Sequence, residues 1–277
     1  MATRLGNRAE RLSAVRALRS VKGRREQRRF AFEGATMLAE AARSDFPIAE
    51  LYVTDAAYEG VRLVRELEAS GIPAFLVAPG AAESISDVAT PSGIVAVGPA
   101  RLSDTPELFG SGTPLMILAD LGDPGNAGTL LRSADAFGCA GVLFGAKGVD
   151  PYHPKVVRGS MGAVFRLPIG VASLGEAAAA AVAAGVRIWG LATGGTSLND
   201  EAWPALLALA IGHERRGLGE WESSCERTVA IPMIGAAESL SAGVAGSIAL
   251  YEASKKAGES KRCQESVSGA KSQDYRC

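Results

Sequence analysis

"LADLGDPGNAGTLLRSADAFG", residues 118–138, decides the fold, because within it an apolar strand passes through a tight turn into a helix. Pro124 and Gly125 favour the turn, and Asn126 is a suitable N-cap residue for the helix. Apolar residues recur after the turn at helical spacing and predict the buried face of the helix: Leu130, Leu131, Ala134 and Phe137. Arg132 is roughly opposite this face, so we expect its side chain to point away from the sheet.

Taken alone, this stretch is open to an ordinary and a functional interpretation. Asn126 is either a helix cap or a ligand-binding amide, and Arg132 is either a solvated surface arginine or part of a site. The three glycines of the turn do not have GxGxxG spacing, and the chain has no GxxxxGK[ST] loop and no GxSxG elbow. The residues therefore lack the common signatures of dinucleotide, P-loop and serine-hydrolase sites.

Strands and helices are predicted to alternate on the C-terminal side of residue 114. Apolar runs predict strands near 115–119, 141–144, 187–192, 207–211 and 228–231. Helical periodicity predicts helices near 126–137, 154–162, 173–184 and 239–256. This alternation favours an α/β fold with a parallel sheet covered on both faces. Ligands of such sheets bind beyond the carboxyl ends of the strands, which places a candidate site in the loops 120–128, 192–197, 212–219 and 232–239.

The first hundred residues predict a second, smaller α/β domain. A basic amphipathic helix is expected over 8–20, with Leu12, Val15 and Leu18 on its apolar face, and strands are expected over 48–55 and 94–97. We therefore expect the chain to consist of an N-terminal domain at 1–98, a linker at 99–113, a second domain at 114–256 and a polar, disordered tail at 257–277.

Composition excludes several classes of protein. The chain is 47% hydrophobic and 6% aromatic, which suits α/β packing. It has no apolar run of about 18 residues and no signal-peptide core, so no membrane association and a cytoplasmic location are expected. The four cysteines lack CxxC spacing, and "HERRG" at 213–217 lacks the second histidine of HExxH. We therefore expect no metal.

The basic residues are concentrated at the N-terminus. Residues 1–30 hold ten Lys and Arg against two Glu, although the net charge of the chain is −1. This run is either a solvated helix face or a phosphate-binding arm for nucleic acid, and composition alone favours neither. The arginines expected to contact RNA in the second case are Arg24, Arg25, Arg28, Arg29 and Arg158.

Three segments, each expected to follow a strand, together resemble the SpoU/TrmH family of RNA 2′-O-ribose methyltransferases, within the SPOUT superfamily. They are "DPGNAGTLLRSADAFG", "IGHERRGL" and "IPMIGAAESLSAGVAGSIALYE", which resemble the family's motifs one, two and three in that order. "DPYHPKVVRGSMGAVFRLPI" resembles the segment between motifs one and two. "RRFAFEGATMLAEA" and "ATPSGIVAV" resemble an accessory RNA-binding domain that is similar to a ribosomal protein.

The resemblance implies a C-terminal domain with a deep trefoil knot, an obligate homodimer, and S-adenosylmethionine (AdoMet) bound in the knot. By position, the residues implied to bind this cofactor are Ala192, Thr193, Gly212, Ile231, Met233 and Leu240. Glu214 matches the acid of motif two, and Ser239 matches the serine of motif three. Ser239 is also a potential cap for a helix whose apolar stripe is predicted to be Leu240, Val244, Ile248 and Tyr251.

The implied reaction is transfer of a methyl group from a sulfonium to a ribose hydroxyl. The family assigns removal of the hydroxyl proton to the arginine of motif one, here Arg132. Because a guanidinium stays protonated in proteins, we instead expect Arg132 to bind the ribose and its phosphate and to stabilise the developing alkoxide. Asn126 is expected to orient either the arginine or the ribose.

The chain departs from the family pattern at two positions, and the departure at position 241 favours a second function class. Position 241 is Ser where the family usually has Asn, and Arg215 stands where the family commonly has Gly. Arg215 and Arg216 are either RNA contacts or solvated side chains. The leading hypothesis is methylation of structured RNA, with rRNA favoured over tRNA. The alternative is a catalytically weak RNA-binding or ribosome-assembly factor with the same fold.

Overall fold

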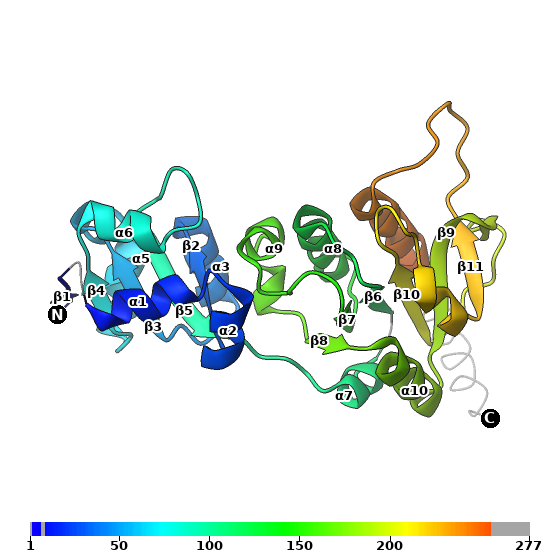
Figure 1. Ribbon diagram of the computed structural model, residues 1–277, viewed down its shortest axis with the longest axis horizontal. Helices are drawn as coiled ribbons and strands as arrows, with labels where there is room; N and C mark the ends of the chain where they lie inside the picture. The colour runs from blue at the N-terminus through cyan, green and yellow to red at the C-terminus, as the bar shows by residue number, and fades with distance from the viewer. Residues whose placement is uncertain (1, 7–8, 113, 256–277) are drawn as a thin grey trace, which may run out of the picture. The chain divides into compact units, whose positions relative to one another are not determined.

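The chain forms two compact units in the computed structural model (Figure 1), which describes residues 2–6, 9–112 and 114–255. The N-terminal unit comprises Met1–Leu102 and Asp150–Arg166, and the C-terminal unit comprises Ser103–Val149 and Leu167–Cys277. The polar tail predicted at 257–277 lies outside the described residues. The N-terminal unit is therefore assembled from two separate stretches of chain.

A five-stranded mixed sheet organises the N-terminal unit, in the order β1-β4-β3-β5-β2. Its strands are β1 (Thr3–Arg4), β2 (Arg29–Glu33), β3 (Glu50–Val53), β4 (Ala74–Leu76) and β5 (Ile94–Pro99). β5 pairs antiparallel with β2 and β3, whereas β4 pairs parallel with β3 and β1. The strands predicted at 48–55 and 94–97 are present as β3 and β5.

Short amphipathic helices surround this sheet. They are α1 (Glu10–Ala17), α2 (Val21–Gln27), α3 (Ala35–Arg43), α4 (Asp55–Gly60), α5 (Arg62–Ala69) and α6 (Pro79–Ile85). The apolar face predicted for 8–20 is buried, with Leu12, Val15 and Leu18 each at most 3% exposed. The periodicity of the sequence therefore identified α1, although the helix ends three residues earlier than predicted.

Residues 150–166 complete the N-terminal unit, although they follow motif one in the chain. They form α9 (Pro154–Gly159) and the 3-10 turn η1 (Ala163–Phe165). The Tyr152 ring is 4.5 Å from that of Phe30, and the Phe165 ring is 4.9 Å from that of Phe32, between centroids. These contacts bury aromatic side chains of β2 that the first stretch of chain does not cover alone.

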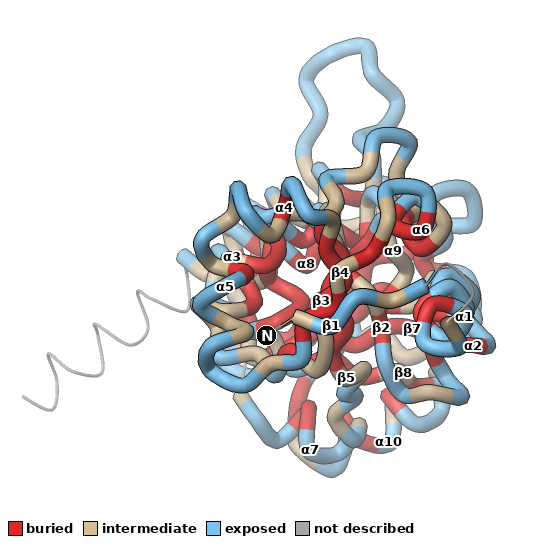
Figure 2. The backbone as a smooth tube through the Cα atoms, turned by 90° about the vertical axis from the view of Figure 1, so that its left-hand side faces the viewer, coloured by how far each residue is buried: buried red, intermediate tan, exposed pale blue. Residues whose placement is uncertain are grey.

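A six-stranded sheet, parallel at every pairing, organises the C-terminal unit, as the sequence predicts. Its order is β11-β9-β10-β6-β7-β8. The strands are β6 (Leu115–Leu118), β7 (Gly141–Gly145), β8 (Ile169–Ala172), β9 (Arg187–Ser197), β10 (Leu207–Ile211) and β11 (Arg227–Ala230). Figure 2 shows strands such as β7 largely in the buried colour, because this sheet is apolar on both faces.

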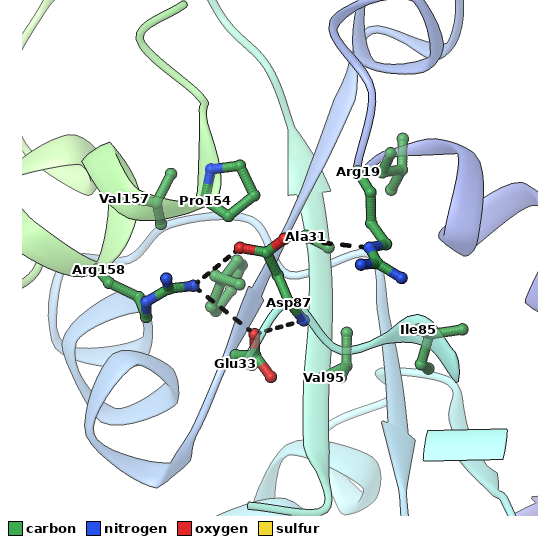
Figure 3. A pocket seen from close by; sticks show the side chains of 11 residues that line it. Arg19, Ala31, Glu33, Ile85, Asp87, Val95, Pro154, Val157 and Arg158 are labelled. Carbon is green, nitrogen blue, oxygen red and sulfur yellow. Dashed lines mark hydrogen bonds and ion pairs between the residues drawn. The ribbon is translucent and has the colours of Figure 1, made fainter. Parts of the chain in front are cut away.

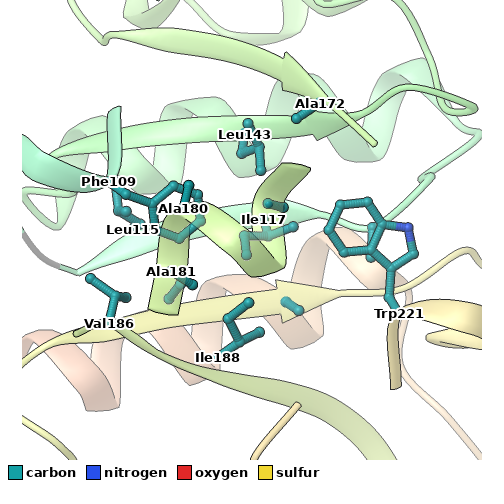
Figure 4. Packing of buried hydrophobic residues seen from close by; sticks show 14 of the residues in the cluster. Phe109, Leu115, Ile117, Leu143, Ala172, Ala180, Ala181, Val186, Ile188 and Trp221 are labelled. Carbon is teal, nitrogen blue, oxygen red and sulfur yellow. The ribbon is translucent and has the colours of Figure 1, made fainter. Parts of the chain in front are cut away.

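Helices cover both faces of the sheet. They are α7 (Thr105–Gly110), α8 (Pro124–Ala136), α10 (Leu174–Ala184), the 3-10 helix η2 (Gly219–Ser224) and a helix over 242–255. Phe109, Ala180 and Trp221 pack with Leu115, Ile117 and other strand residues in one core (Figure 4). Leu130, Leu131 and Ala134 of α8 are fully buried, as predicted, whereas Phe137 is only half-buried.

Several elements differ from the sequence prediction. α7 lies within the stretch taken as a linker, and its Leu108 and Phe109 belong to the core of the C-terminal unit. β8 was not predicted, because its four residues give no clear period. The expected loop at 192–197 is the second half of β9, since β11 pairs with Thr196 and Ser197 after a register shift.

Candidate active site

A pocket of about 330 Å³ lies at the carboxyl ends of β10 and β11 and beside the middle of β9. The six residues expected to contact a cofactor all line this pocket: Ala192, Thr193, Gly212, Ile231, Met233 and Leu240. Glu214 and Ser239 line it as well. Parallel pairing explains the convergence, because Leu191 of β9 pairs with Ile211, the last residue of β10, and β9 continues past it to pair with β11. The loop over 231–241 projects from this end of the sheet, and nearly all of it is exposed (Figure 1).

Gly212 occupies a position where no other side chain fits. A Cβ atom there would be 2.2 Å from the carbonyl carbon of Gly217 and 2.5 Å from the amide nitrogen of Leu218. His213 and Gly217 also exchange two backbone hydrogen bonds of 2.8 Å, which close a short turn after β10. The motif-two segment is therefore folded back on itself at the wall of the pocket.

Glu214 joins motif two to the turn of motif one. Its Oε1 accepts hydrogen bonds from the Asp123 N–H and the Asn126 Nδ2, both at 3.0 Å, and its Oε2 accepts one from the Gly122 N–H at 3.3 Å. Burial alone would raise the pKa of this carboxyl, but the hydrogen bonds from Asn126 and the backbone outweigh it and lower the pKa. Glu214 is therefore an ionised acceptor that holds two loops together.

Asn126 is not the cap of its helix, which corrects the sequence interpretation. α8 begins at Pro124, and Asp123 is the cap, because Asp123 Oδ1 accepts the Asn126 N–H at 2.8 Å. The Asn126 amide instead donates to Glu214 and accepts the Gly243 N–H at 3.3 Å. One side chain thus connects motifs one, two and three, so Asn126 acts on the site by positioning its loops.

Arg132 is exposed on α8, away from the buried face of that helix, as predicted. In the part of the chain that the structure describes, its guanidinium makes no hydrogen bond or ion pair. Motif one therefore supplies a free, permanently charged group on the helix whose first turn contacts Glu214.

The helix over 242–255 packs through small residues, not through its predicted stripe. Val244, Ile248 and Tyr251 are 46%, 37% and 47% exposed, so the predicted stripe is wrong. The buried positions include Gly243 and Gly246, where an added Cβ would be 2.9 Å from Asn126 Oδ1 and 2.5 Å from Leu130 Cδ2. Glycine permits this close approach to α8, and Leu250 is also buried, whereas Val244, Ile248 and Tyr251 face outward.

Ser241, and not Ser239, caps this helix. Ser241 Oγ accepts the Val244 N–H at 3.3 Å, and the first helical residue is Ala242. Ser239 is exposed and lines the pocket two residues earlier. The departure at position 241 therefore keeps a capping function that Ser and Asn serve about equally.

The arginines expected to contact RNA have different environments in the N-terminal unit. Arg25 and Arg28 are exposed, and Arg29 is exposed but lies 3.2 Å from a carboxylate oxygen of Glu50. Arg24 is 3% exposed. Its Nε donates to Asp150 at 2.8 Å, and its Nη1 donates to the carbonyl of Leu18 at 2.8 Å. Arg24 is therefore a structural residue, because its guanidinium is inaccessible to phosphate.

Arg158 also makes ion pairs with carboxylates. It points toward two acids in a small cavity of the N-terminal unit (Figure 3), with Nη1 3.2 Å from Asp87 Oδ2 and 3.9 Å from Glu33 Oε1. Its side chain is 33% exposed. A phosphate contact by Arg158 would have to compete with two carboxylates.

Sequence reasoning missed two residues of this region. His213 lines the pocket, and its Nδ1 accepts the Arg215 N–H at 3.1 Å; its place in motif two was the available signal. Asp120 follows β6 with a φ of 52°, and its carboxylate accepts the Lys147 N–H and the Trp221 Nε1–H at 3.1 and 3.0 Å. No pattern in a single sequence marks such a strained aspartate.

Two further findings on the described residues concern metal ions and membranes. No group of three or more His, Cys, Asp or Glu side chains in this part of the chain is placed to hold a metal ion. Among the same residues, no helix is both long enough and apolar enough to cross a membrane.

Two family profiles match the chain. Residues 114–251 match the profile described as SpoU rRNA Methylase family, and residues 9–96 match the profile described as MRM3-like substrate binding domain. The two matched ranges together include each of the candidate pocket residues and most of the N-terminal sheet.

Two relatives are similar to the chain, one over most of its length and one over about half of it. The 23S rRNA (guanosine(2553)-2′-O)-methyltransferase of Bacillus subtilis is 29% identical over 84% of this chain and 92% of its own length. The 23S rRNA (uridine(2479)-2′-O)-methyltransferase of Streptomyces viridochromogenes is 41% identical over 47% of this chain and 48% of its own length.

Two crystal structures extend the similarity to the fold. AviRb, a SpoU methyltransferase from Streptomyces viridochromogenes in complex with AdoMet, has a TM-score of 0.79 and 28% identity, covering 90% of this chain and 98% of its own. An AdoMet-bound rRNA methyltransferase from Sinorhizobium meliloti has the same TM-score and 26% identity, covering 92% of this chain and 98% of its own.

Proposed function

The chain belongs to the SpoU family of RNA methyltransferases, and we propose that it transfers a methyl group from AdoMet to a ribose 2′-hydroxyl of ribosomal RNA. The observation that carries this proposal is the pocket at the ends of β10 and β11 and beside the middle of β9, in which the residues of motifs two and three meet. Glu214 and Asn126 attach the turn of motif one to the same pocket. The related rRNA methyltransferases favour rRNA over tRNA as the substrate.

The pocket fits the cofactor in size and chemistry. Its volume of about 330 Å³ is within the range of small-molecule sites. Leu191, Ile231 and Leu240 provide apolar walls for an adenosine, and Ala192 and Gly212 allow close approach to the backbone. These residues would hold AdoMet, which supplies an activated methyl group when bound.

Arg132 stabilises the negative charge that develops on the ribose 2′-oxygen. In the reaction, the 2′-oxygen would bond to the methyl carbon as the bond from that carbon to sulfur breaks, and the hydroxyl proton would pass to water. The permanently charged guanidinium of Arg132 stabilises the developing alkoxide and binds the adjacent phosphate. Asn126 does not touch the ribose in this proposal, because both ends of its amide are bonded to Glu214 and Gly243.

The N-terminal unit binds the RNA substrate in this proposal, and the C-terminal segment forms the trefoil knot of the family. Arg25 and Arg28 are the exposed arginines available for phosphate, with Arg29 shared between phosphate and Glu50. We place the reaction in the cytoplasm, with the RNA. Phosphate contacts of this kind give binding that weakens as salt rises.

The outward face of the helix over 242–255 supports a homodimer. Val244, Ile248 and Tyr251 form an exposed apolar stripe, and the ring of Tyr251 is 5.6 Å from that of Phe137. Exposed stripes of this kind mark association sites. Ile248→Lys is expected to convert a dimer into monomers in sedimentation velocity, whereas Val182→Lys, at an exposed valine of α10, leaves the dimer intact. A monomeric wild-type protein would contradict the dimer.

Ser241 was the feature that favoured the alternative, a binding factor without activity. Its capping bond to Val244 gives this residue a structural role that is compatible with catalysis. The departure therefore no longer favours loss of activity.

Mapping of 2′-O-methylated nucleotides in rRNA and tRNA, from cells with and without the gene, tests the proposed function. We expect one ribose methylation of rRNA to depend on the gene, and calorimetry to show AdoMet binding by the purified protein. A gene-dependent methylation confined to tRNA would overturn the substrate assignment. Absence of AdoMet binding and of any methylation would support the binding factor.

A further inference from the structure

The turn over residues 213–217 carries two arginines on a rigid support. His213 and Gly217 close it with two backbone hydrogen bonds of 2.8 Å, and Gly217 has a φ of 60°. The Arg215 N–H donates to His213 Nδ1 at 3.1 Å, which fixes the tip of the turn as well. Such a turn presents Arg215 and Arg216 with little loss of backbone freedom on binding.

The acid within the turn is not available to neutralise these arginines. Glu214 directs its carboxylate to the motif-one turn, where it accepts hydrogen bonds from Gly122, Asp123 and Asn126. Arg215 and Arg216 are both exposed. Across the described residues, no carboxylate forms an ion pair with either guanidinium, so both charges face solvent unpaired.

A third cation lies close to the turn. Lys147 is paired with Glu220, with Nζ 2.8 Å from Oε2. This pairing raises the pKa of Lys147, while the nearby positive charge of Arg216 acts in the opposite direction. Lys147 is already neutralised by Glu220, so the unpaired positive charge at this turn is that of Arg215 and Arg216, which an anion bound beside them would stabilise.

We propose that Arg215 and Arg216 form a phosphate-binding subsite for the RNA strand that carries the target ribose. The inference rests on the proposed function. Gly212, His213, Glu214 and Gly217 line the pocket, so the turn that holds both arginines is part of its wall. A nucleotide that presents its 2′-hydroxyl to this pocket brings its flanking phosphates to the same edge.

Guanidinium groups suit this role. They bind phosphate through two parallel hydrogen bonds and remain charged. The chain has a net charge of −1, so attraction of RNA depends on local groups of cations and not on an overall positive field. The arginine turn supplies such a group beside the reacting centre.

The test measures RNA binding by Arg215→Gln/Arg216→Gln as a function of salt, with an in vitro transcript of 23S rRNA as probe. Loss of two phosphate contacts is expected to reduce the slope of log affinity against log salt by about 1.4. The KM for RNA is expected to rise about tenfold or more, with the Kd for AdoMet unchanged. Arg215→Lys/Arg216→Lys should keep most of the slope, because the charges remain.

The matched control is Arg187→Gln, at an exposed arginine that begins β9, pairs with Glu226 and does not line the pocket. It should bind RNA with the wild-type salt slope. An unchanged slope and KM in the double Gln variant, while the wild type methylates RNA, would overturn the subsite. A reduced slope together with a wild type that transfers no methyl group would keep the subsite and overturn the proposed function.

Discussion

Glu214 is the residue whose contacts most tightly define the site. It accepts three hydrogen bonds from the turn of motif one, and one of these comes from Asn126, which in turn binds the helix of motif three. The sequence marks Glu214 as the acid of motif two but does not reveal what it binds. In the structure it is a positioning residue, because its acceptor sites already serve the protein.

Glu214 gives a pH-dependent contribution to stability. Its pKa is lowered in the folded state from an ordinary value of 4.5, so its contribution is present above that value and is lost as pH falls through the folded-state pKa. Glu214→Gln is expected to lower the free energy of unfolding by about 0.5–1.5 kcal/mol at pH 7, because the amide replaces one acceptor oxygen by an NH2 group and one exposed N–H donor loses its partner.

Urea unfolding of both proteins between pH 7 and pH 3 checks this expectation. The stability difference between wild type and Glu214→Gln should shrink once the pH falls below about 4.5, as the wild-type carboxyl is protonated. A difference that stays constant over the whole range would contradict the ionised role of Glu214.

At the scale of elements, close backbone contact shapes the pocket. Gly212 meets Gly217 and Leu218 at distances that no Cβ tolerates, and Gly243 and Gly246 bring the last described helix onto α8. Each of these contacts is between parts of the chain that are separated by a turn or by more than a hundred residues. Together these contacts hold the residues of motifs one, two and three next to one another.

Gly212→Ala is expected to abolish AdoMet binding, because the added methyl group overlaps backbone atoms and must displace the turn over 213–217. The control is Gly175→Ala in α10, where an added Cβ meets nothing within 4 Å; it should raise stability by about 0.5–1 kcal/mol. Calorimetric titration with AdoMet distinguishes the two. Wild-type affinity in Gly212→Ala would show that the turn moves freely, against this account.

The sequence predicts the parallel sheet well, because apolar strand runs are a local signal. The pocket-lining positions came from the resemblance of the three motifs to the family. The sequence prediction fails for the helix over 242–255, where Val244 and Ile248 have the spacing of a buried stripe but Gly243, Gly246, Ala249 and Leu250 form the packed face. A single sequence shows apolar spacing but not which face another helix approaches. The same limit explains Arg24, whose burial depends on Asp150, more than a hundred residues away.

At the scale of the whole molecule, the N-terminal unit depends on residues 150–166. Asp150 pairs with the buried Arg24, and Tyr152 and Phe165 cover the aromatic side chains of β2. The N-terminal unit is therefore not a separate length of chain that ends before motif one. It is expected to need this later segment for its stability.

Asp150→Ala is expected to destabilise the N-terminal unit by about 3–5 kcal/mol, because it leaves the charge of Arg24 buried without a partner. Hydrogen exchange of the β2 amides reports on this unit alone, and their protection should fall accordingly. Asp200→Ala, at an exposed aspartate of the C-terminal unit, is the control. Equal protection of β2 in the two variants would contradict the dependence on residue 150.

The most direct measurement of the central claim is transfer of a tritiated methyl group from AdoMet to rRNA by the wild type and by Arg132→Ala. The account predicts that the wild type labels a ribose 2′-hydroxyl, and that Arg132→Ala binds AdoMet normally but transfers at least about 100-fold more slowly. Near-normal transfer by Arg132→Ala, or no transfer by the wild type, would contradict it.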